Sequence, residues 1–309
     1  MAEQVIINEV GLRDGLQNQP VTVATPDKFK LLRSLLDAGV RYFEPVSYAH
    51  PRAVPQMADA SELAALLPHT SDTHYTAMVP NLRGYQRARA DGFTTMALLL
   101  STTDSFNQRN LNMSRDAALQ SCQEILAAAK LEGVHCRAYL AGALACPYDG
   151  IVDTAETLAL AQQLIDAGAD EIGIADTIGA GHPRQLHQLI PPLLKQLGEQ
   201  RLLLHLHDTR GLALSLAWTA CELGVRRFDS AIGGLGGCPF APGATGNVAT
   251  EDLVYLLERA GLDTGISLEG LRESAALAAE LTRTEARGRI FAWSDSQRQR
   301  GKTIDWQSS

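Results

Sequence analysis

Short apolar runs alternate with helical patterns along most of this 309-residue chain. Runs rich in apolar and β-branched residues predict strands. In chain order these cover 4–9, 40–45, 74–79, 94–100, 134–141, 170–175, 201–206 and 226–232. Helical patterns separate them, at about 26–38, 58–67, 82–91, 115–132, 153–168, 183–198 and 210–224. Several of these helical segments end on a glycine just before the next strand, as at Gly39 and Gly168, and such a glycine is a typical helix stop.

This alternation predicts the architecture. Eight strands separated by helices match a (β/α)8 barrel, or TIM barrel, which commonly has roughly 250 residues. The alternative, a doubly wound parallel sheet, has less support because no Gly-x-Gly-x-x-Gly pattern follows the first strand. The segment after residue 248 predicts the eighth helix and a small helical C-terminal extension. We therefore expect one catalytic α/β domain over 1–285 and a C-terminal tail over 286–309, polar and mobile from Ser294.

Composition narrows the classes of partner. A hydrophobic content of 45% and a charged content of 20% are ordinary for a globular protein. The net charge of -8 argues against nucleic acid or an anionic membrane as the main partner, and no apolar span reaches the ~20 residues of a transmembrane helix. The N-terminus enters the first strand with no room for a signal peptide. Five cysteines without Cys-x-x-Cys spacing disfavour disulfides and predict a reducing, cytoplasmic setting.

Two histidines lie at the end of the seventh predicted strand. His205 and His207 alternate with leucines, so both imidazoles leave the same face of the strand. Asp14 follows the first strand and Asn247 follows the eighth. The active sites of such barrels lie at the C-terminal ends of the strands, and strands 1, 7 and 8 are neighbours. A histidine pair can be purely structural, but its convergence with Asp14 and Asn247 favours a site for Mg²⁺ or Mn²⁺.

Further candidates surround this predicted site. Arg13 directly precedes Asp14, and a guanidinium there can neutralise an oxyanion such as an enolate. Arg13 can also pair with Glu44 or Asp176, which would orient it. The glycine-rich stretch 233–240 is typical of a mobile lid that places Cys238 over a substrate as a proton donor or acceptor. A buried cysteine without a role is the alternative.

Six motifs together resemble one family. They are EVGLRDGLQNQP at 9–20, VPQMADA at 54–60, ACPYDG at 145–150, GIADTIGAG at 173–181, HLHDTRGLAL at 205–214 and GGLGGCPFAPGATGNVATEDLVYLLE at 233–258. From about residue 5 to about residue 285 the chain resembles the 3-hydroxy-3-methylglutaryl-CoA lyases. That family belongs to the metal-dependent lyase and Claisen-type condensing TIM barrels, and the last motif is long and highly specific.

The resemblance implies a carbon–carbon lyase that cleaves 3-hydroxy-3-methylglutaryl-CoA to acetyl-CoA and acetoacetate with Mg²⁺ or Mn²⁺, as in leucine degradation. It implies an acyl-CoA as the substrate, and we expect a homodimer or higher homo-oligomer. The family's metal ligands correspond to Asp14, His205, His207 and Asn247. Its arginine, lid cysteine, strand-2 acid, DTIG aspartate and substrate-side glutamine correspond to Arg13, Cys238, Glu44, Asp176 and Gln17.

The implied mechanism agrees with the residue chemistry. The metal would chelate the C3 hydroxyl and a carboxylate oxygen, and a base would remove the hydroxyl proton. His205, Asp14 and a metal-bound hydroxide are the candidates for that base. The C2–C3 bond would then break in a retro-Claisen step. Arg13 would stabilise the resulting thioester enolate, and Cys238 would help to protonate it.

Departures from the family pattern concern the acyl group. Tyr48 stands where phenylalanine is usual, Arg210 where tyrosine is common and Leu12 where proline is frequent, and the tail has no cysteine. The acyl group is therefore hydroxymethylglutaryl or a relative such as citramalyl or a longer branched chain. For the CoA phosphates, the candidates are Arg109 with Asn107 and Asn110, and Lys302.

Two other functions compete with the lyase. A Claisen-condensing acyltransferase of the isopropylmalate synthase type shares the RDG and HxH motifs, but such enzymes generally carry extra C-terminal domains. A non-catalytic binding barrel is disfavoured because the proposed ligands, Arg13 and Cys238 are all present.

Overall fold

The computed structural model describes residues 2–237, 246–285, 288–304 and 306. Among these residues, eight parallel strands close into a barrel in the order β1-β10-β9-β8-β5-β4-β3-β2. The barrel strands are β1 (Ile6–Glu9), β2 (Tyr42–Ser47), β3 (His74–Met78), β4 (Thr95–Ser101), β5 (His135–Ala141), β8 (Glu171–Asp176), β9 (Leu202–Leu206) and β10 (Arg227–Ser230). The (β/α)8 prediction is confirmed, and the doubly wound alternative is wrong.

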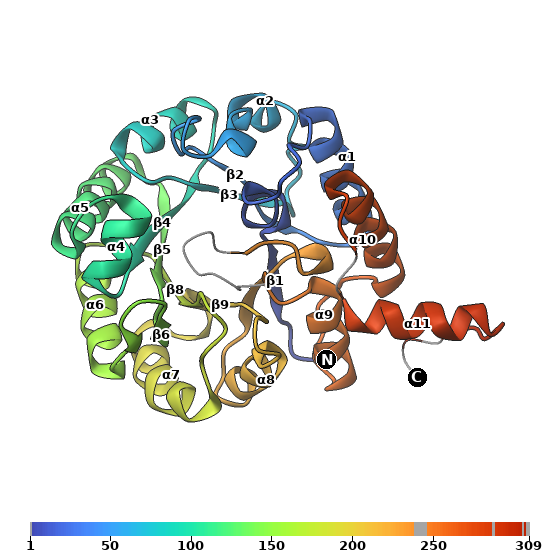
Figure 1. Ribbon diagram of the computed structural model, residues 1–309. Coiled ribbons are helices and arrows are strands. Elements are labelled where there is room, and N and C mark those ends of the chain that lie inside the picture. The colour runs from blue at the N-terminus through green and yellow to red at the C-terminus, as the bar shows by residue number, and fades with distance from the viewer. Residues whose placement is uncertain (1, 238–245, 286–287, 305, 307–309) are drawn as a thin grey trace.

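Helices surround the strands as an outer ring (Figure 1). They are α1 (Thr25–Asp37), α2 (Ala60–Ala64), α3 (Leu82–Ala90), α4 (Asp104–Leu111), α5 (Arg115–Glu132), α6 (Thr154–Asp166), α7 (Pro183–Leu197), α8 (Ala213–Glu222) and α9 (Thr250–Arg259). The sequence analysis did not predict α4, whose sequence DSFNQRNL lacks an apolar stripe. The Thr103 side chain caps α4 by accepting a hydrogen bond from the backbone of Phe106. No helix in the described part of the chain is both long and apolar enough to cross a membrane.

A short antiparallel hairpin interrupts the β5–α6 connection. It consists of β6 (Ala145–Cys146) and β7 (Gly150–Ile151). Local capping explains where the next helix begins, because the Asp153 side chain accepts a hydrogen bond of 2.9 Å from the backbone of Ala155. At the other end of α6, Gly168 adopts a positive φ of 107°, so the glycine stop read from the sequence is present.

The strands alternate between an apolar outer face and a polar inner face. On β5, Cys136, Ala138 and Leu140 belong to the main hydrophobic core between barrel and helices, whereas Arg137 and Tyr139 alternate with them. Barrel interiors are usually filled by layers of branched apolar side chains. The interior cluster here holds Met78, Ala97, Tyr139 and Leu203. Charged side chains share this space, so a polar network lies beneath the C-terminal ends of the strands.

The chain continues past α9 into two further helices, α10 (Leu268–Thr282) and α11 (Arg289–Gln299). Helix α10 packs beside α1, with the Ser34 and Ser274 hydroxyl oxygens 2.7 Å apart. Helix α11 extends away from the barrel (Figure 1), and the Asp252 carboxylate of α9 accepts hydrogen bonds from the backbone at its start. The predicted helical C-terminal extension is confirmed. Ser294 is fully buried within α11, and the division into domains at residue 285 stays a prediction.

Candidate metal centre

A cavity of about 420 Å³ opens at the C-terminal ends of the barrel strands. One part of its wall is polar and carries Arg13, Asp14, Gln17, His205 and His207. Another part is apolar and includes Met78, Leu99, Phe106 and Leu111. The sequence analysis predicted the polar set from residues far apart in the chain. The structure brings its members to one cavity, as expected for the catalytic face of such a barrel.

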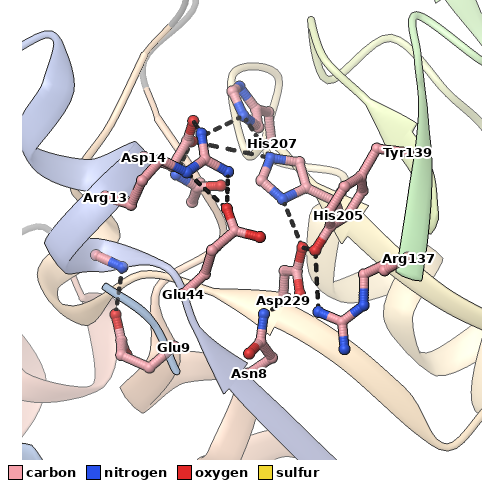
Figure 2. Close-up of polar contacts among 12 residues, drawn as sticks. Asn8, Glu9, Arg13, Asp14, Glu44, Arg137, Tyr139, His205, His207 and Asp229 are labelled. Atoms are coloured by element: carbon pink, nitrogen blue, oxygen red, sulfur yellow. Dashed lines mark hydrogen bonds and ion pairs between the residues drawn. The ribbon is translucent and has the colours of Figure 1, made fainter. Parts of the chain in front are cut away.

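Asp14, His205 and His207 form a compact group of potential ligands (Figure 2). The two histidine Nε2 atoms lie 3.1 Å apart. Oδ2 of Asp14 lies 3.9 Å from each of them. All three side chains are buried. Three potential donor atoms therefore converge on one point at the cavity wall.

The geometry of this group fits a divalent cation. Metal–nitrogen bonds of about 2.1 Å place two adjacent ligands of an octahedron roughly 3 Å apart. The two Nε2 atoms have this spacing. Each neutral imidazole has one bare ring nitrogen, and two bare nitrogens facing each other need a proton or a cation between them. A carboxylate with two imidazoles and no thiolate matches the ligand preference of Mg²⁺ or Mn²⁺.

Asn247 contacts this group through its amide nitrogen. Its Nδ2 donates a hydrogen bond of 2.8 Å to Oδ2 of Asp14 and one of 3.0 Å to the carbonyl of Leu235. Asn247 therefore lies at the predicted position, and as a ligand it would offer its Oδ1 atom. The backbone of Gly236 lies directly against this amide, because a Cβ atom there would be 2.5 Å from Nδ2. Gly236 and Asn247, both in the segment between β10 and α9, are therefore in close contact.

A single π-helical turn, Gly11–Gly15, places Arg13 and Asp14. The backbone N–H groups of Arg13, Asp14 and Gly15 all donate to the carbonyl of Val10, at 3.1, 2.7 and 3.1 Å. π-Turns are rare and occur frequently at functional sites. This one directs two successive side chains into the barrel end, where an extended strand would send them to opposite faces.

Arg13 is held between two carboxylates. Its Nε donates to Oε1 of Glu44 at 2.6 Å, and its Nη1 donates to Oδ1 of Asp14 at 2.6 Å. Burial alone lowers the pKa of Arg13, but Glu44 and Asp14 raise it above its ordinary value, so the guanidinium is charged. Burial raises the pKa of Glu44, and Arg13 acts in the opposite direction. The predicted pairing of Arg13 with Glu44 is confirmed.

Electrostatics divide the ligand group. Burial by itself raises the pKa of Asp14, but Arg13 and the two histidines lower it to about 2. Burial and the neighbouring His205 lower the pKa of His207 to about 4. Burial also acts to lower the pKa of His205. The hydrogen bond and charge of Asp229, together with the charge of Asp14, outweigh burial and raise this pKa. An anionic carboxylate thus faces two imidazoles whose pKa values are shifted in opposite directions.

The sequence analysis missed Asp229, which lies behind His205. Its Oδ2 atom is 3.0 Å from Nδ1 of His205 and accepts a hydrogen bond of 2.7 Å from the Tyr139 hydroxyl. Its Oδ1 accepts a hydrogen bond of 2.8 Å from Asn8. Charged residues at alternate positions of one predicted strand, Arg227 and Asp229, were the available signal. Charged side chains are seldom buried inside a protein unless they are paired with other groups.

The remaining predicted residues lie at different distances from the centre. Gln17 lines the cavity and donates to Oδ1 of Asp14 at 3.2 Å. Asp176 is buried and does not line the cavity. Its two oxygens accept hydrogen bonds of 2.9 Å from the backbone of Ala180 and Gly181. A direct substrate contact of Asp176 stays a prediction. Cys238 lies outside the described residues, while Gly237 before it lines the cavity.

The candidates for contacting CoA phosphates are also separated. Asn110 lines the cavity. Asn107 is fully buried, and its amide hydrogen-bonds to the backbone of Ser101 and Thr103, so it serves the β4–α4 turn. The Arg109 guanidinium lies over the ring of Tyr148, 4.7 Å from its centre. Lys302 follows α11, which leads away from the barrel (Figure 1).

A buried carboxylate ties the loops of this region together. Oε1 of Glu9 accepts hydrogen bonds from the backbone of Gly11 at 2.7 Å and of Ile232 at 3.0 Å. Its Oε2 accepts a hydrogen bond of 2.6 Å from the Thr250 hydroxyl. Glu9 thereby joins the turn that carries Arg13 to the loop after β10. The sequence analysis did not single out Glu9.

Comparison with known proteins gives a consistent result. The family model described as HMGL-like matches residues 4–278. The chain is 41% identical to the mitochondrial hydroxymethylglutaryl-CoA lyase of Bos taurus over 89% of this chain and 84% of that protein. It is 38% identical to a hydroxymethylglutaryl-CoA lyase of Bacillus subtilis, over 88% of this chain and 91% of that protein.

A solved structure agrees with these relatives. The HMG-CoA lyase from Acinetobacter baumannii, in complex with coenzyme A and 3-methylmalate, superposes with a TM-score of 0.90 at 33% identity. The match covers 94% of each chain. By its sequence, its barrel and the ligand group at the barrel mouth, this chain belongs to the HMGL-like family.

Proposed function

We propose that this protein is a divalent-cation-dependent carbon–carbon lyase. Its substrate would be 3-hydroxy-3-methylglutaryl-CoA or a closely related 3-hydroxyacyl-CoA, cleaved to acetyl-CoA and a keto acid. The observation that carries the proposal is the convergence of Asp14, His205 and His207 in a cavity that also presents Arg13. The names of the relatives, and the coenzyme A in the similar solved structure, support an acyl-CoA as the substrate.

The proposed cofactor is Mg²⁺ or Mn²⁺. Asp14, His205 and His207 would hold it, with Asn247 beside them. When bound, such a cation supplies Lewis-acid polarisation of a chelating oxygen pair and lowers the pKa of a coordinated hydroxyl. Buried ligands on separate barrel strands and loops give the site a fixed shape before substrate arrives.

Cleavage needs a base for the C3 hydroxyl proton. Asp14 and His205 both line the cavity. Nε2 of His205 would hold the cation and its Nδ1 lies against Asp229, so Asp14 is the one of the two with an atom left to accept the proton. As the proton leaves, the C3–O electron pair forms the ketone and the C2–C3 bond breaks. The electron pair of that bond moves onto the thioester, which becomes an enolate.

Arg13 is suited to stabilise the enolate oxygen. It is charged, and Glu44 and Asp14 hold it at the cavity wall through three of its contacts. A fixed cation aimed at developing negative charge lowers a barrier because it needs no reorganisation during the reaction. We assign Cys238 to returning a proton to the enolate carbon, and Gln17 and Asp176 to substrate binding.

A direct assay tests the proposal. Purified protein with Mg²⁺ or Mn²⁺ is incubated with a panel of 3-hydroxyacyl-CoA esters, including hydroxymethylglutaryl-CoA and citramalyl-CoA, and acetyl-CoA release is followed. We expect release that a chelator abolishes and added cation restores. No release from any ester, or full activity after complete removal of cations, would contradict the proposal.

The biological setting follows from the same proposal. We propose a role in leucine degradation, a cytoplasmic location and a homodimer or higher homo-oligomer, together with one catalytic domain over 1–285. The four cysteines within the described residues are free and buried, in keeping with a reducing compartment. Light scattering coupled to size-exclusion chromatography measures the oligomeric state.

A further inference from the structure

We infer that Asp229 is a positioning residue that fixes the tautomer of His205, so that the bare Nε2 of His205 points into the cation site. The inference rests on the divalent cation of the proposed function but is independent of its substrate. It concerns a contact beneath the cavity, since Asp229 is only 1% exposed and does not line it.

The direct contact defines which ring nitrogen carries hydrogen. Nδ1 of His205 lies 3.0 Å from Oδ2 of Asp229 (Figure 2). An ionised carboxylate only accepts hydrogen bonds, so Nδ1 must donate. A neutral imidazole has a single N–H, and Nε2 therefore keeps its lone pair. Carboxylate–histidine pairs orient metal ligands in this way.

Further hydrogen bonds hold the Asp229 carboxylate in this orientation. Asn8 donates to its Oδ1 at 2.8 Å, and the Tyr139 hydroxyl donates to its Oδ2 at 2.7 Å. Arg137 donates a hydrogen bond of 3.2 Å to the Tyr139 hydroxyl oxygen, and arginine cannot accept one. The hydroxyl hydrogen is therefore free to point at Asp229. Arg137 is in turn held by Glu171 at 2.6 Å. Every group around Asp229 thus delivers a hydrogen to it.

The barrel register builds this arrangement. Asn8 pairs with Asp229 between β1 and β10, and Asp229 pairs with His205 between β10 and β9. Three adjacent strands therefore present their side chains at one level of the barrel interior. Tyr139 reaches the same level from β5 across Gly173, where a Cβ atom would lie 2.3 Å from the ring. The absence of a side chain at Gly173 makes room for the tyrosine.

The two histidines differ in this support. Nδ1 of His207 is buried and has no hydrogen-bond partner among the described residues. The two Nε2 atoms lie 3.1 Å apart, and a hydrogen on Nε2 of His205 would remove the lone pair that a cation would need. Asp229 prevents this. His205 is consequently the member of the pair that a side-chain hydrogen bond orients.

The first experiment measures cation affinity rather than activity. Mn²⁺ binding to the Asp229→Asn variant is determined by electron paramagnetic resonance and by calorimetry. We expect the dissociation constant to rise about 10- to 100-fold, as is typical for loss of such a partner. The matched control is Asp170→Asn, which removes the same charge at the opposite end of the barrel, before β8. Affinity of Asp229→Asn within twofold of the unchanged protein would overturn the inference.

A second measurement needs no change at Asp229 and covers the case in which that variant fails to fold. The unchanged, cation-free protein is labelled with ¹⁵N-histidine, and His205 is identified by comparison with His205→Gln. Spectra are recorded at alkaline pH, where the ring is neutral, and there we expect the ¹⁵N shifts of hydrogen on Nδ1 and a bare Nε2. A neutral His205 with its hydrogen on Nε2 would overturn the inference. Tyr139→Phe, which leaves the carboxylate in place, should keep this pattern and weaken Mn²⁺ binding less than Asp229→Asn does.

These results are separable from the proposed function. Cation binding that depends on Asp229, in a protein that cleaves no 3-hydroxyacyl-CoA, would sustain the inference and contradict the proposed function. Cleavage with unchanged cation affinity in Asp229→Asn would do the reverse.

Discussion

At the scale of the residue, neighbouring positions with opposite charge have separate tasks. Arg13 and Asp14 are adjacent in the chain and hydrogen-bonded to each other, but only Asp14 faces the histidine Nε2 atoms. Glu44 balances the guanidinium from the other side. Buried charges are tolerated only when they are paired, because removal from water costs several kcal/mol for each ion. Pairing here also orients the two groups.

Removing the guanidinium should affect turnover more than cation binding. For Arg13→Gln we expect kcat to fall about 10²- to 10³-fold, the usual cost of losing an oxyanion donor. Mn²⁺ affinity should not weaken, because Asp14 loses a neighbouring positive charge. Steady-state kinetics and Mn²⁺ titration check both. The control is Arg41→Gln, at a half-exposed guanidinium paired with Asp72 outside the barrel. Turnover within twofold of normal would refute the role of Arg13.

Replacing the predicted lid thiol is a separate residue-scale test. We expect Cys238→Ser to lower kcat about 10²-fold or more, in the range of general acid–base catalysis, since a hydroxyl is a much poorer proton donor than a thiol. The dissociation constant for Mn²⁺ should be unchanged, because Cys238 is not among the proposed ligands. Kinetics of acetyl-CoA release measure the first effect. Near-normal turnover would remove Cys238 from the mechanism.

At the scale of the element, the site depends on how irregular segments are held at the strand ends. The π-turn after β1 and the loop after β10 carry Asp14 and lead to Asn247. Glu9 connects the two segments through backbone hydrogen bonds. These contacts are buried and join segments far apart in the chain, so packing of the protein itself places Asp14 relative to Asn247.

Adding a methyl group at Gly236 tests the loop after β10. Gly236 has a φ of +124°, and its new Cβ atom would lie 2.5 Å from Nδ2 of Asn247. We expect Gly236→Ala to weaken Mn²⁺ binding about 10-fold or more, from backbone strain of about 1–3 kcal/mol and displacement of Asn247. Gly261→Ala is the matched control, since Gly261 has a φ of +84° with open space around it. Equal Mn²⁺ affinities of the two variants would contradict this interpretation.

At the scale of the whole molecule, buried carboxylates link stability to pH. Burial raises the pKa of Glu251 to about 8 and that of Glu9 to about 7, although hydrogen bonds to both act in the opposite direction. Burial also acts to raise the pKa of Glu171, but His135, Arg137 and Arg227 lower it below the ordinary value. The first two groups favour the folded state when protonated, and Glu171 favours it when ionised.

The free energy of unfolding should therefore pass through a maximum in mildly acidic solution. A carboxyl whose pKa is higher in the folded protein contributes stability below its unfolded pKa of 4.5, and this is lost as pH rises toward 7 or 8. Each such group lowers stability by up to about 1.4 kcal/mol per pH unit in that window. Glu171 contributes stability above its unfolded pKa, which is lost as pH falls further.

Urea unfolding of the cation-free protein between pH 4 and pH 8 measures this dependence. In Glu251→Gln, which cannot ionise, the decline between pH 5 and pH 8 should be shallower. Glu251 accepts a hydrogen bond from the backbone N–H of Gly233, and the side-chain oxygen of the glutamine can accept the same bond. If stability rose steadily from pH 5 to pH 8, or if Glu251→Gln declined as steeply as the unchanged protein, the prediction would be wrong.

Cation binding should also stabilise the entire barrel. A ligand that binds only the folded state at 100 times its dissociation constant adds about 2.7 kcal/mol to the free energy of unfolding. We expect Mn²⁺ to raise the melting temperature and a chelator to reverse the rise, measured by differential scanning calorimetry. Asp14→Asn should abolish the shift. A shift of equal size in Asp14→Asn would place the cation elsewhere.

Much of this protein follows from local sequence pattern. The ends of every barrel strand lie within two residues of the predicted ends. This agreement is possible because the apolar residues of a strand or helix repeat every few positions, and the repeat can be read from the sequence. His205 and His207 were found because the same period puts them on one face. Asp14 and Asn247 were predicted to lie beside them because barrel closure makes the first strand a neighbour of the last.

Only the tertiary structure revealed which side chains lie behind the proposed ligands. The pairing of Asp229 with His205, and of Asn8 with Asp229, depends on the register between strands. Glu9 acquires its role only when the π-turn and the loop after β10 lie side by side. Register, burial and the direction of each hydrogen bond are set by packing across the closed barrel. The chain by itself therefore predicted the barrel strands and the proposed ligands, while the folded barrel decided how each of these side chains is held.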